Sequence, residues 1–351
     1  MAAVTLREVA AAAGVSVGTA SNAFSRPDLV SAQARERVHA AARKLNYGGP
    51  NPAARRLRTG EAGALGLIFT EDLEYAFGDD AALQFLAGVA DALRDRGAGL
   101  LMVPLSSKQE EATRLVREAL VAAFVVYSCA NGDPRVAAAV QRRLPVVIVD
   151  QPQDTPRVPF VGIDDRAAAR SAAEHVRALG HERVAIVSFA TTSPDIGDRV
   201  FPLTTERRAG YHDGLGDIEP ELVVCRPNSH EAAEEAGRAL LHRDPADRPT
   251  ALLCMSDAIA LGCRRVAAAL DIDVPRQLSI VGFDDSPVAL LSDPPLTTVA
   301  QPMAEKGRVA TERSLAAAAG RKRLPRRTIM PTELVVRGTT AAPPRTRRRR
   351  S

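Results

Sequence analysis

One short motif in this sequence has the residue types and spacing of a covalent catalyst. Residues 14–18 read Gly-Val-Ser-Val-Gly, the G-x-S-x-G pattern that carries the nucleophilic serine of many hydrolases. That motif needs a buried strand before the serine, whereas the residues before Gly14 have the apolar spacing of a helix. We therefore interpret Ser16 as a helix N-cap whose hydroxyl or backbone N–H can also contact a phosphate.

The other reactive side chains form no catalytic or metal-binding pattern. The sequence contains no HExxH motif, no GxGxxG after a strand and no Walker lysine. Its cysteines are widely spaced without a CxxC pair, which argues against a disulfide framework or a zinc site: Cys129, Cys225, Cys254 and Cys263. We expect no metal, no cofactor and no enzymatic activity.

Charge is distributed unevenly along the chain. The net charge of +4 consists of +6 over residues 1–60, −12 over residues 61–320 and +10 over residues 321–351. Clustered basic side chains release counterions from phosphate backbones, so we expect a basic terminus to bind a polyanion. Lysine is scarce, because 42 of the 46 basic residues are arginine; the lysines are Lys44, Lys108, Lys306 and Lys322.

Length and composition predict a soluble protein of several domains. At roughly 100 to 200 residues per domain, 351 residues suggest two or three, and 46% hydrophobic residues suffice for their cores. No apolar run approaches the roughly 20 residues that span a bilayer, and Arg7 and Glu8 interrupt any signal peptide. We expect a cytoplasmic protein without membrane contact.

The first 50 residues predict three short helices. Thr5 is an N-cap for a first helix, and Gly14 permits the left-handed turn that ends it. Ser16 caps a second helix through Phe24, and Ser31 caps a third. This order is the helix-turn-helix plan. If the second helix enters a major groove, its first residues face base edges: Val17, Gly18, Ser21 and Asn22. The alternative is a small unit that only docks proteins.

Residues 51–60 predict a short basic helix. Asn51 is a suitable N-cap, and Gly60 can end the helix. About two turns do not persist alone in water, so this helix is expected to form when docked. Leu57 is a lone large apolar residue among arginines, which is typical of a wedge between base steps in the minor groove. A basic linker with an incidental leucine is the alternative.

Three phrases carry a family resemblance. VTLREVAAAAGVSVGTASNAFS, VSAQARERVHAAARKLNY and NPAARRL closely resemble the DNA-binding head and hinge of lactose-repressor-type (LacI/GalR) bacterial transcription factors. The resemblance implies that Val17 and Gly18 read bases, with Asn22 at a third position, and that Leu57 intercalates in a pseudo-palindromic operator. Many members carry Arg at the position of Asn22. The candidate DNA contacts are Thr5, Ser16, Val17, Gly18, Thr19, Ser21, Asn22, Asn51, Ala54, Arg55 and Leu57.

The body of the chain alternates short apolar runs with amphipathic segments. Such runs are typical of strands buried on both faces of a parallel sheet. We expect two doubly wound α/β lobes, with strands at residues 65–69, 99–103, 123–127, 145–149, 183–187, 222–225, 251–254 and 279–283. The intervening helices are expected near residues 81–96, 110–120, 167–179, 207–215, 230–241 and 258–269.

This body resembles the periplasmic-binding-protein-like core of the same family, notably in VGIDDRAAARSAAEHVRALGHERVAIVS and SIVGFDDSPVALLSDPPLTTVAQP. The resemblance implies three crossings between the lobes. The expected domains are a helix-turn-helix head (1–50), a hinge (51–61), an N-terminal lobe (62–160 and 292–324), a C-terminal lobe (161–291 and 325–340) and a disordered basic tail (341–351).

The ligand of such a fold lies between the lobes, at the carboxyl ends of the strands. The resemblance places Arg207 and Asp284 at the effector, with Ser256 where many members have Asn. Asp257 is expected to support the fold. Candidates from the other lobe, chosen by position, are Tyr75, Phe77, Asp79, Asp80 and Ser128, with Phe77 as a possible stacking platform. The expected effector is sugar-like or nucleoside-like.

These features predict a DNA-binding transcriptional regulator, usually a repressor, controlled by that effector. Two heads are needed to read a pseudo-palindrome in double-stranded DNA, and the tail lacks leucine heptads, so a homodimer is expected. The bacterial cytoplasm is the expected location, with nucleoid association when the operator is bound. The alternatives are a solute-binding protein of the same fold, which needs export, and a doubly wound enzyme.

Overall fold

The computed structural model describes most of the chain in two compact units, Met1–Glu61 and Ala62–Ser351. The described residues are 4–25, 27–45, 47, 64–69, 73–94, 96–103, 109–155, 157–190, 201–226, 228–321 and 325–344. The predicted hinge at residues 51–61 lies outside them.

The first unit is the expected bundle of short helices: α1 (Leu6–Ala13), α2 (Val17–Ser25), the 3-10 turn η1 (Pro27–Leu29) and α3 (Ala32–Lys44). The predicted caps are confirmed. Thr5 and Glu8 form a capping box, Gly14 adopts φ 62°, and the Ser16 hydroxyl accepts a hydrogen bond from the Thr19 amide at 3.0 Å. Small apolar residues with exposed fractions of 0 to 8% form the core: Val9, Ala10, Ala13, Ala20, Ala23, Val38, Ala41 and Ala42.

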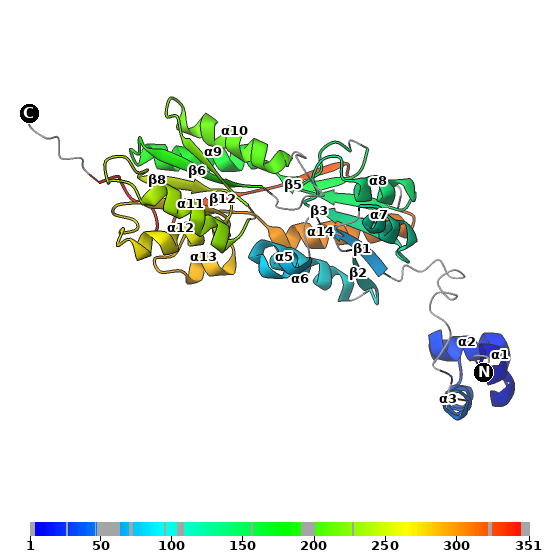
Figure 1. Cartoon of the computed structure of the whole chain (residues 1–351). Helices are drawn as coiled ribbons and strands as arrows, with labels where there is room; N and C mark the ends of the chain where they lie inside the picture. The colour runs from blue at the N-terminus through cyan, green and yellow to red at the C-terminus, as the bar shows by residue number, and fades with distance from the viewer. Residues whose placement is uncertain are drawn as a thin grey trace, which may run out of the picture. The chain divides into compact units, whose positions relative to one another are not determined.

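The second unit contains two six-stranded sheets (Figure 1). We call the part around the first sheet the N-lobe. Its strand order is β11-β5-β4-β3-β1-β2, and every neighbouring pair is parallel. The strands are β1 (Ala64–Phe69), β2 (Gly99–Val103), β3 (Ala123–Tyr127), β4 (Val146–Val149), β5 (Phe160–Ile163) and β11 (Arg327–Met330).

The part around the second sheet is the C-lobe. Its strand order is β12-β10-β9-β8-β6-β7, and only the pairing of β12 with β10 is antiparallel. The strands are β6 (Val184–Phe189), β7 (Glu221–Cys225), β8 (Ala251–Cys254), β9 (Ser279–Asp284), β10 (Thr297–Ala300) and β12 (Glu333–Val335). The predicted class of two doubly wound α/β lobes is therefore confirmed.

Helices cover both faces of each sheet. The N-lobe helices are α5 (Leu73–Gly78), α6 (Asp80–Arg94), α7 (Gln109–Glu118), α8 (Pro134–Gln141) and α14 (Met303–Ala318). The C-lobe helices are α9 (Asp165–Ala178), α10 (Pro202–Leu215), α11 (His230–Leu241), α12 (Asp257–Ala269) and α13 (Pro287–Leu291).

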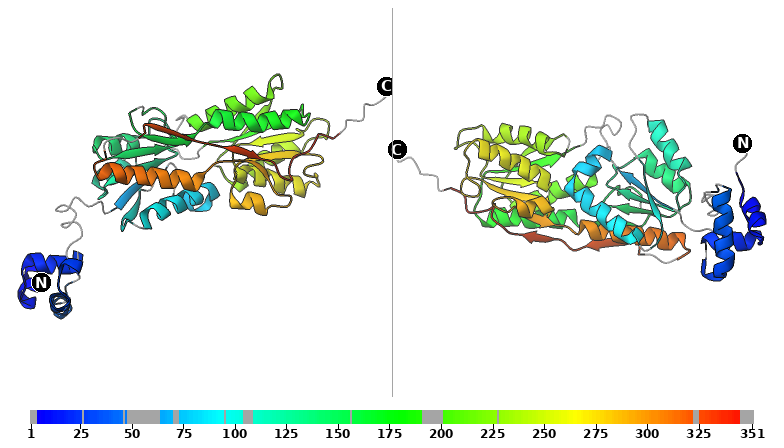
Figure 2. Two further views of the ribbon diagram at one scale, coloured as in Figure 1. Left: turned by 180° about the vertical axis from the view of Figure 1, so that it is seen from behind. Right: turned by 90° about the horizontal axis from the view of Figure 1, so that it is seen from below.

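The chain passes between the lobes three times: after β5, after β10 and after β11. Figure 2 shows the last crossing as the red strands that run from one lobe to the other. The expected boundaries are corrected. β5 pairs with β4 and β11 in the N-lobe sheet, so the first crossing follows residue 163 and not residue 160. The segment from residue 292 to β10 was expected in the N-lobe, but it belongs to the C-lobe because β10 pairs with β9. Residue 325 was expected to start the C-lobe, but β11 pairs with β5 in the N-lobe.

The last described residues are held on the C-lobe. Ala341 donates to the Ser279 hydroxyl at 3.0 Å, and its carbonyl oxygen lies 2.9 Å from Nε2 of the buried His181. The predicted start of the disordered tail at residue 341 is therefore wrong, because Ala341 still has hydrogen-bond partners in the C-lobe. Residues 345–351 lie outside the described part of the chain.

The placement of α14 in the N-lobe gives a testable prediction. A Cβ atom at Gly88 of α6 would lie 1.8 Å from the Ala304 carbonyl oxygen of α14, so Gly88→Ala should separate the two helices. We expect a loss of about 1–3 kcal/mol of unfolding free energy, measured by thermal denaturation. The control Gly78→Ala places its Cβ in open space and should cost nothing. Equal stability of the two variants would contradict the close packing of α14 on α6.

Candidate functional site

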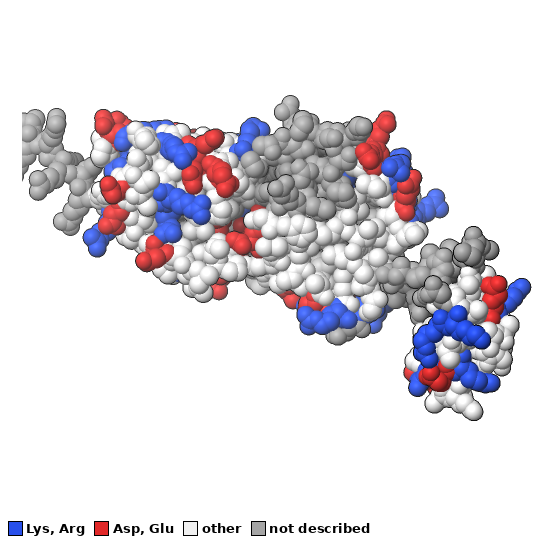
Figure 3. All heavy atoms as spheres, turned by 60° about the horizontal axis from the view of Figure 1, so that its bottom comes forward, with Lys and Arg blue, Asp and Glu red and all other residues white. Residues whose placement is uncertain are grey.

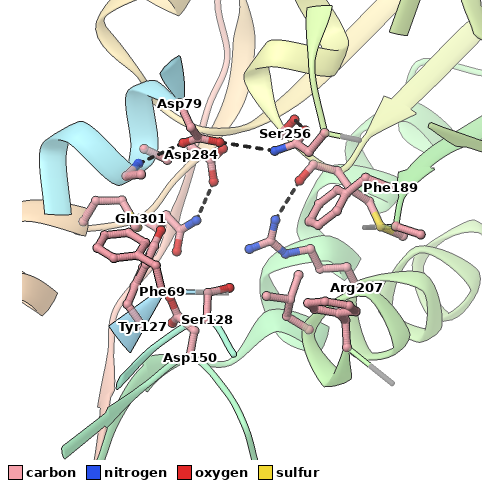
Figure 4. Close-up of a pocket in the computed structure, with 18 residues that line it drawn as sticks. Phe69, Asp79, Tyr127, Ser128, Asp150, Phe189, Arg207, Ser256, Asp284 and Gln301 are labelled. Carbon is pink, nitrogen blue, oxygen red and sulfur yellow. Dashed lines mark hydrogen bonds between the residues drawn. The ribbon is translucent and has the colours of Figure 1, made fainter. Parts of the chain in front are cut away.

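A cavity lies between the lobes at the carboxyl ends of the strands (Figure 4). Its volume is about 90 Å³, which is less than the roughly 300–1,000 Å³ of pockets for drug-sized ligands. An adjoining cavity of about 270 Å³ shares Asp79, Ser256 and Asp284 with it. The lining residues are Phe69, Asp79, Ala81, Ala82, Tyr127, Ser128 and Asp150 of the N-lobe, Phe189, Ala190, Phe201, Leu203, Arg207, Asn228, Met255, Ser256 and Asp284 of the C-lobe, and Gln301 and Met303 at the second crossing.

Arg207 provides the positive charge of the cavity wall. Close packing of α10 on α9 positions it, since a Cβ at Gly210 would lie 2.1 Å from the Arg166 carbonyl oxygen. Its Nε donates to Asp165 at 2.9 Å and its Nη1 to the Met255 carbonyl at 2.7 Å. The guanidinium carbon lies 3.6 Å from the centre of the Phe283 ring.

These contacts leave one side of the guanidinium directed at a ligand. In Figure 4 the remaining terminal nitrogen of Arg207 points into the cavity. Burial opposes the charge, but Asp165 and Asp284 outweigh it and keep the pKa of Arg207 raised. The planar group therefore stays ionised and can donate to neighbouring oxygens of a ligand.

Asp284 ends β9 and faces Arg207 across the cavity. Its backbone adopts φ 121°, and its Oδ1 accepts a hydrogen bond of 2.5 Å from Nε2 of Gln301. Burial raises the pKa of Asp284 well above its ordinary value; Asp257 and Asp79 raise it further, while Arg207 lowers it. Burial therefore disfavours the charged form of Asp284, and an ionised carboxylate at this place costs stability, which is typical of functional sites.

A polar bridge joins the lobes beside these residues. The Ser256 hydroxyl donates to Oδ1 of Asn228 at 2.6 Å, and Nδ2 of Asn228 donates across the cleft to Oδ2 of Asp79 at 3.4 Å. Oδ1 of Asp79 in turn accepts from the Ala82 amide at the start of α6. Contacts at the cleft can therefore influence how close the lobes lie.

The structure brings together five of the predicted effector contacts: Asp79, Ser128, Arg207, Ser256 and Asp284. Asp80 lines an adjoining cavity. Asp257 accepts hydrogen bonds from Ser286 and Thr298, which agrees with the expected structural role. The prediction that Phe77 is a stacking platform is corrected, because Phe77 lines neither cavity and is 56% exposed on α5. The side chain of Tyr75 lies outside the described residues.

Sequence reasoning missed most of the apolar wall and part of the polar wall. Phe69 and Tyr127 end predicted strands, and Asp150 follows one directly. The rule that strand ends face the cleft would therefore have found them. Gln301 follows β10, a strand that the apolar pattern did not reveal.

The head presents the N-terminal turn of α2 to solvent. Ser16, Val17 and Gly18 are exposed, whereas Asn22 is half-buried. Figure 3 shows basic side chains on this unit; the exposed ones are Arg7, Arg35, Arg37, Arg43 and Lys44.

Three predicted DNA contacts have structural surroundings of their own in the head. The prediction that Ser21 contacts DNA is corrected, because Ser21 is 6% exposed and is buried in the head. The exposed Thr5 serves the capping box, and the half-buried Thr19 hydroxyl lies 2.9 Å from that of Ser16. The candidates Asn51, Ala54, Arg55 and Leu57 lie outside the described residues.

The described residues show no alternative reactive centre. They contain no group of His, Cys, Asp and Glu side chains suited to a metal ion, and no helix among them could cross a membrane. All four cysteines are buried free thiols, and burial raises the pKa of Cys225 to about 12.

Comparisons with known proteins match both parts of the chain. The family described as bacterial regulatory proteins, lacI family, matches residues 5–51, and the periplasmic binding protein-like domain matches residues 173–340. An HTH-type transcriptional regulator of Mycobacterium tuberculosis is 42% identical over 356 residues, which cover 97% of each chain. The similarity thus includes head and lobes together.

Solved structures give the same result. The lac repressor dimer bound to operator and the anti-inducer ONPF is 27% identical with a TM-score of 0.78, covering 97% of this chain and 100% of that chain. The complex of the transcriptional regulator CelR with cellobiose is 26% identical with a TM-score of 0.69, covering 96% of this chain and 99% of that chain.

The buried carboxyl group in the cavity predicts a gain of stability on its removal. Because the folded pKa of Asp284 is raised, its contribution to stability is fully present below the unfolded pKa and is lost as the pH rises through the folded pKa. Asp284→Asn should therefore raise Tm by about 2–4 °C at about pH 8, with the difference closing near pH 4, measured by calorimetry. The exposed Asp244→Asn is the control. A lower Tm for Asp284→Asn at both pH values would contradict the raised pKa.

Proposed function

Because this chain belongs to the LacI family of bacterial regulatory proteins, we propose that it represses transcription as a homodimer controlled by a small neutral effector. The chain is a DNA-binding regulator of transcription and not an enzyme. The proposed site of action is the bacterial cytoplasm, at an operator in the nucleoid. The proposed effector class rests chiefly on one observation, the charge of the cavity wall.

We assign base reading to the exposed start of α2. Val17 offers an apolar surface for a thymine methyl group, Gly18 allows close approach, and Asn22 can pair with adenine. Ser16 can contact a phosphate through its hydroxyl. The hinge residues, with Leu57 as the minor-groove wedge, remain part of this proposal on the strength of the sequence.

The charges of the cavity select the effector. Asp79, Asp150 and Asp284 line it, whereas Arg207 is the only basic side chain among its described lining residues. Arg207 is already paired with Asp165. A phosphate or carboxylate ligand would therefore meet excess negative charge, while hydroxyl groups can donate to the carboxylates. The aromatic rings Phe69, Phe189 and Phe201 suit the apolar face of a sugar or a base. We accordingly propose a neutral sugar or nucleoside, which fits the cellobiose bound by CelR.

Effector binding is linked to the hinge through the lobes. The ligand would contact Arg207 and Asp284 on the C-lobe and Ser128 on the N-lobe, so its binding favours one separation of the lobes. A ligand shifts such an equilibrium only by its differential affinity for the two states, and operator and effector must affect each other reciprocally.

We propose that an uncharged surface of the second unit forms the dimer interface. Figure 3 shows a broad surface without charged side chains on the face where Figure 1 labels α5, α6, β2 and α13. Large apolar residues are exposed on these elements: Phe77, Leu83, Leu100, Leu101, Leu290 and Leu291. A two-fold dimer buries the same patch on both copies and supplies two heads for a pseudo-palindrome.

A thermal-shift panel tests the proposed effector class. The panel contains cellobiose, other neutral sugars and nucleosides, each beside its phosphorylated counterpart. A neutral ligand present at about 100 times its Kd should stabilise the second unit by about 2.7 kcal/mol, and its phosphorylated counterpart should give a smaller shift. Larger shifts from the phosphorylated compounds would contradict the charge argument.

The same panel tests Arg207. Arg207→Lys keeps a positive charge beside Asp165. Its ammonium lacks the planar shape by which the guanidinium contacts Asp165, the Met255 carbonyl and the ligand at once. We expect it to weaken binding of the selected ligand by roughly tenfold or more. The adjacent exposed Arg208→Lys is the matched control and should bind normally.

Disruption of the apolar surface tests the dimer. Leu101→Asp places a charge at the exposed edge strand β2, where a partner would have to bury it. Analytical ultracentrifugation should then show monomers, and gel-shift assays should show weaker operator binding. Val140→Asp, at a 38% exposed apolar residue of α8, is the control. A dimer that persists with Leu101→Asp would exclude this face.

A further inference from the structure

A lysine that does not reach the cavity is connected to its central carboxylate. Lys306 lies in the first turns of α14 and has an exposed fraction of 0%. Its Nζ donates to Oε1 of Gln301 at 2.5 Å and to Oδ1 of Asp150 at 2.6 Å. Nε2 of Gln301 donates to Asp284. Asp150, Gln301 and Asp284 all line the cavity, but Lys306 does not.

The chemistry of these groups determines how the Gln301 amide is oriented. An ammonium group can only donate, so the amide oxygen must face Lys306. The amide nitrogen then faces Asp284 as a donor. The carbonyl oxygen of a protonated carboxyl group can also accept that hydrogen bond, but a carboxylate accepts it more strongly. Lys306 therefore favours Asp284 in its ionised, accepting form.

We propose that Lys306 is a positioning residue that determines effector specificity: by orienting Gln301 it keeps Asp284 an acceptor for ligand hydroxyl groups. This inference rests on the proposed role of Asp284 as an effector contact. It also connects the lobes, since Asp284 belongs to β9, Gln301 to the second crossing, and Lys306 to α14 of the N-lobe.

The use of lysine fits this role. Arginine supplies 42 of the 46 basic residues of the chain, yet this buried position has lysine. The neighbouring Gly307 packs closely on α6, where an added Cβ would lie 2.2 Å from the Phe85 carbonyl oxygen. A compact ammonium on a slim stem suits such a site, whereas a planar guanidinium demands more room and more acceptors.

Carbon-13 NMR of aspartate side chains tests the proposal on the full-length protein without any effector. The Asp284 carboxyl signal is assigned by its absence in Asp284→Asn. Lys306→Met removes both the charge and the orienting contact, so the pKa of Asp284 should rise above that of the wild type. The control Arg308→Met removes a charge from the same helix, where Arg308 forms exposed ion pairs with Glu305 and Glu312. It should leave the pKa of Asp284 unchanged.

A charge-balanced variant separates positioning from simple neutralisation. Asp150→Asn combined with Lys306→Met removes one negative and one positive charge together. If Lys306 orients Gln301, the pKa of Asp284 stays above the wild-type value, because the amide is free to turn. A return to the wild-type titration would overturn the proposal, since Lys306 would then only offset Asp150. Arg207, Asp257 and Asp79 also act on Asp284 and are unchanged in every variant.

A measurement on the unmodified protein covers the case in which the Lys306 variants do not fold. Only four lysines are present, so nitrogen-15 labelling of lysine gives a simple spectrum in which the buried Lys306 ammonium exchanges slowly. Its signal should shift with the same midpoint as the Asp284 carboxyl group. Absence of that shift would also overturn the proposal.

Ligand binding provides the last discriminating result. A neutral sugar or nucleoside that stabilises the wild type should bind the double variant roughly tenfold more weakly than it binds Asp150→Asn alone. Unchanged affinity would contradict a role in specificity. If no compound in the panel stabilises the wild type, the proposed effector class fails, while the two titrations still decide the role of Lys306.

Discussion

The geometry of the cleft depends on the cost of keeping ionised groups out of water. A buried cation is tolerated only when acceptors surround it. Arg207 meets this condition with Asp165 and the Met255 carbonyl, and Lys306 meets it with Asp150 and Gln301. These acceptors come from both lobes and from a crossing segment. Gln301, which accepts from Lys306 and donates to Asp284, therefore connects the buried cation of the N-lobe to a strand end of the C-lobe.

Much of the fold could be predicted from local pattern because its central strands are buried on both faces. Runs such as residues 123–127 and 251–254 are continuously apolar, and the observed strands have the same bounds. The strands β5, β10, β11 and β12 escaped prediction because each is short and none is a continuous run of large apolar residues. Some also mix polar with apolar residues, and the boundaries between the lobes shifted with them.

The candidate site divides in the same way. Arg207 and Asp284 were identifiable because they match a family pattern and because Asp284 ends an obvious strand. Gln301 and Lys306 were not, since their roles arise only when the crossing segment brings Gln301 beside Asp284 at the end of β9 and Lys306 beside Asp150. Phe77 was chosen by position in the chain, but the turn of α5 exposes it. Local sequence specifies which residues a strand presents, whereas contacts across distant segments require the assembled fold.

The three crossings also affect how the protein is made. The N-lobe sheet is incomplete without β11, and the C-lobe sheet needs β12 and is bound by residues up to Ala341. During synthesis the N-terminal head can fold as soon as it leaves the ribosome, as leading domains generally do. Neither lobe can close until almost the whole chain has emerged. A truncated product would thus carry the head without the core surface proposed to pair two copies, and a single head cannot read both halves of a pseudo-palindrome.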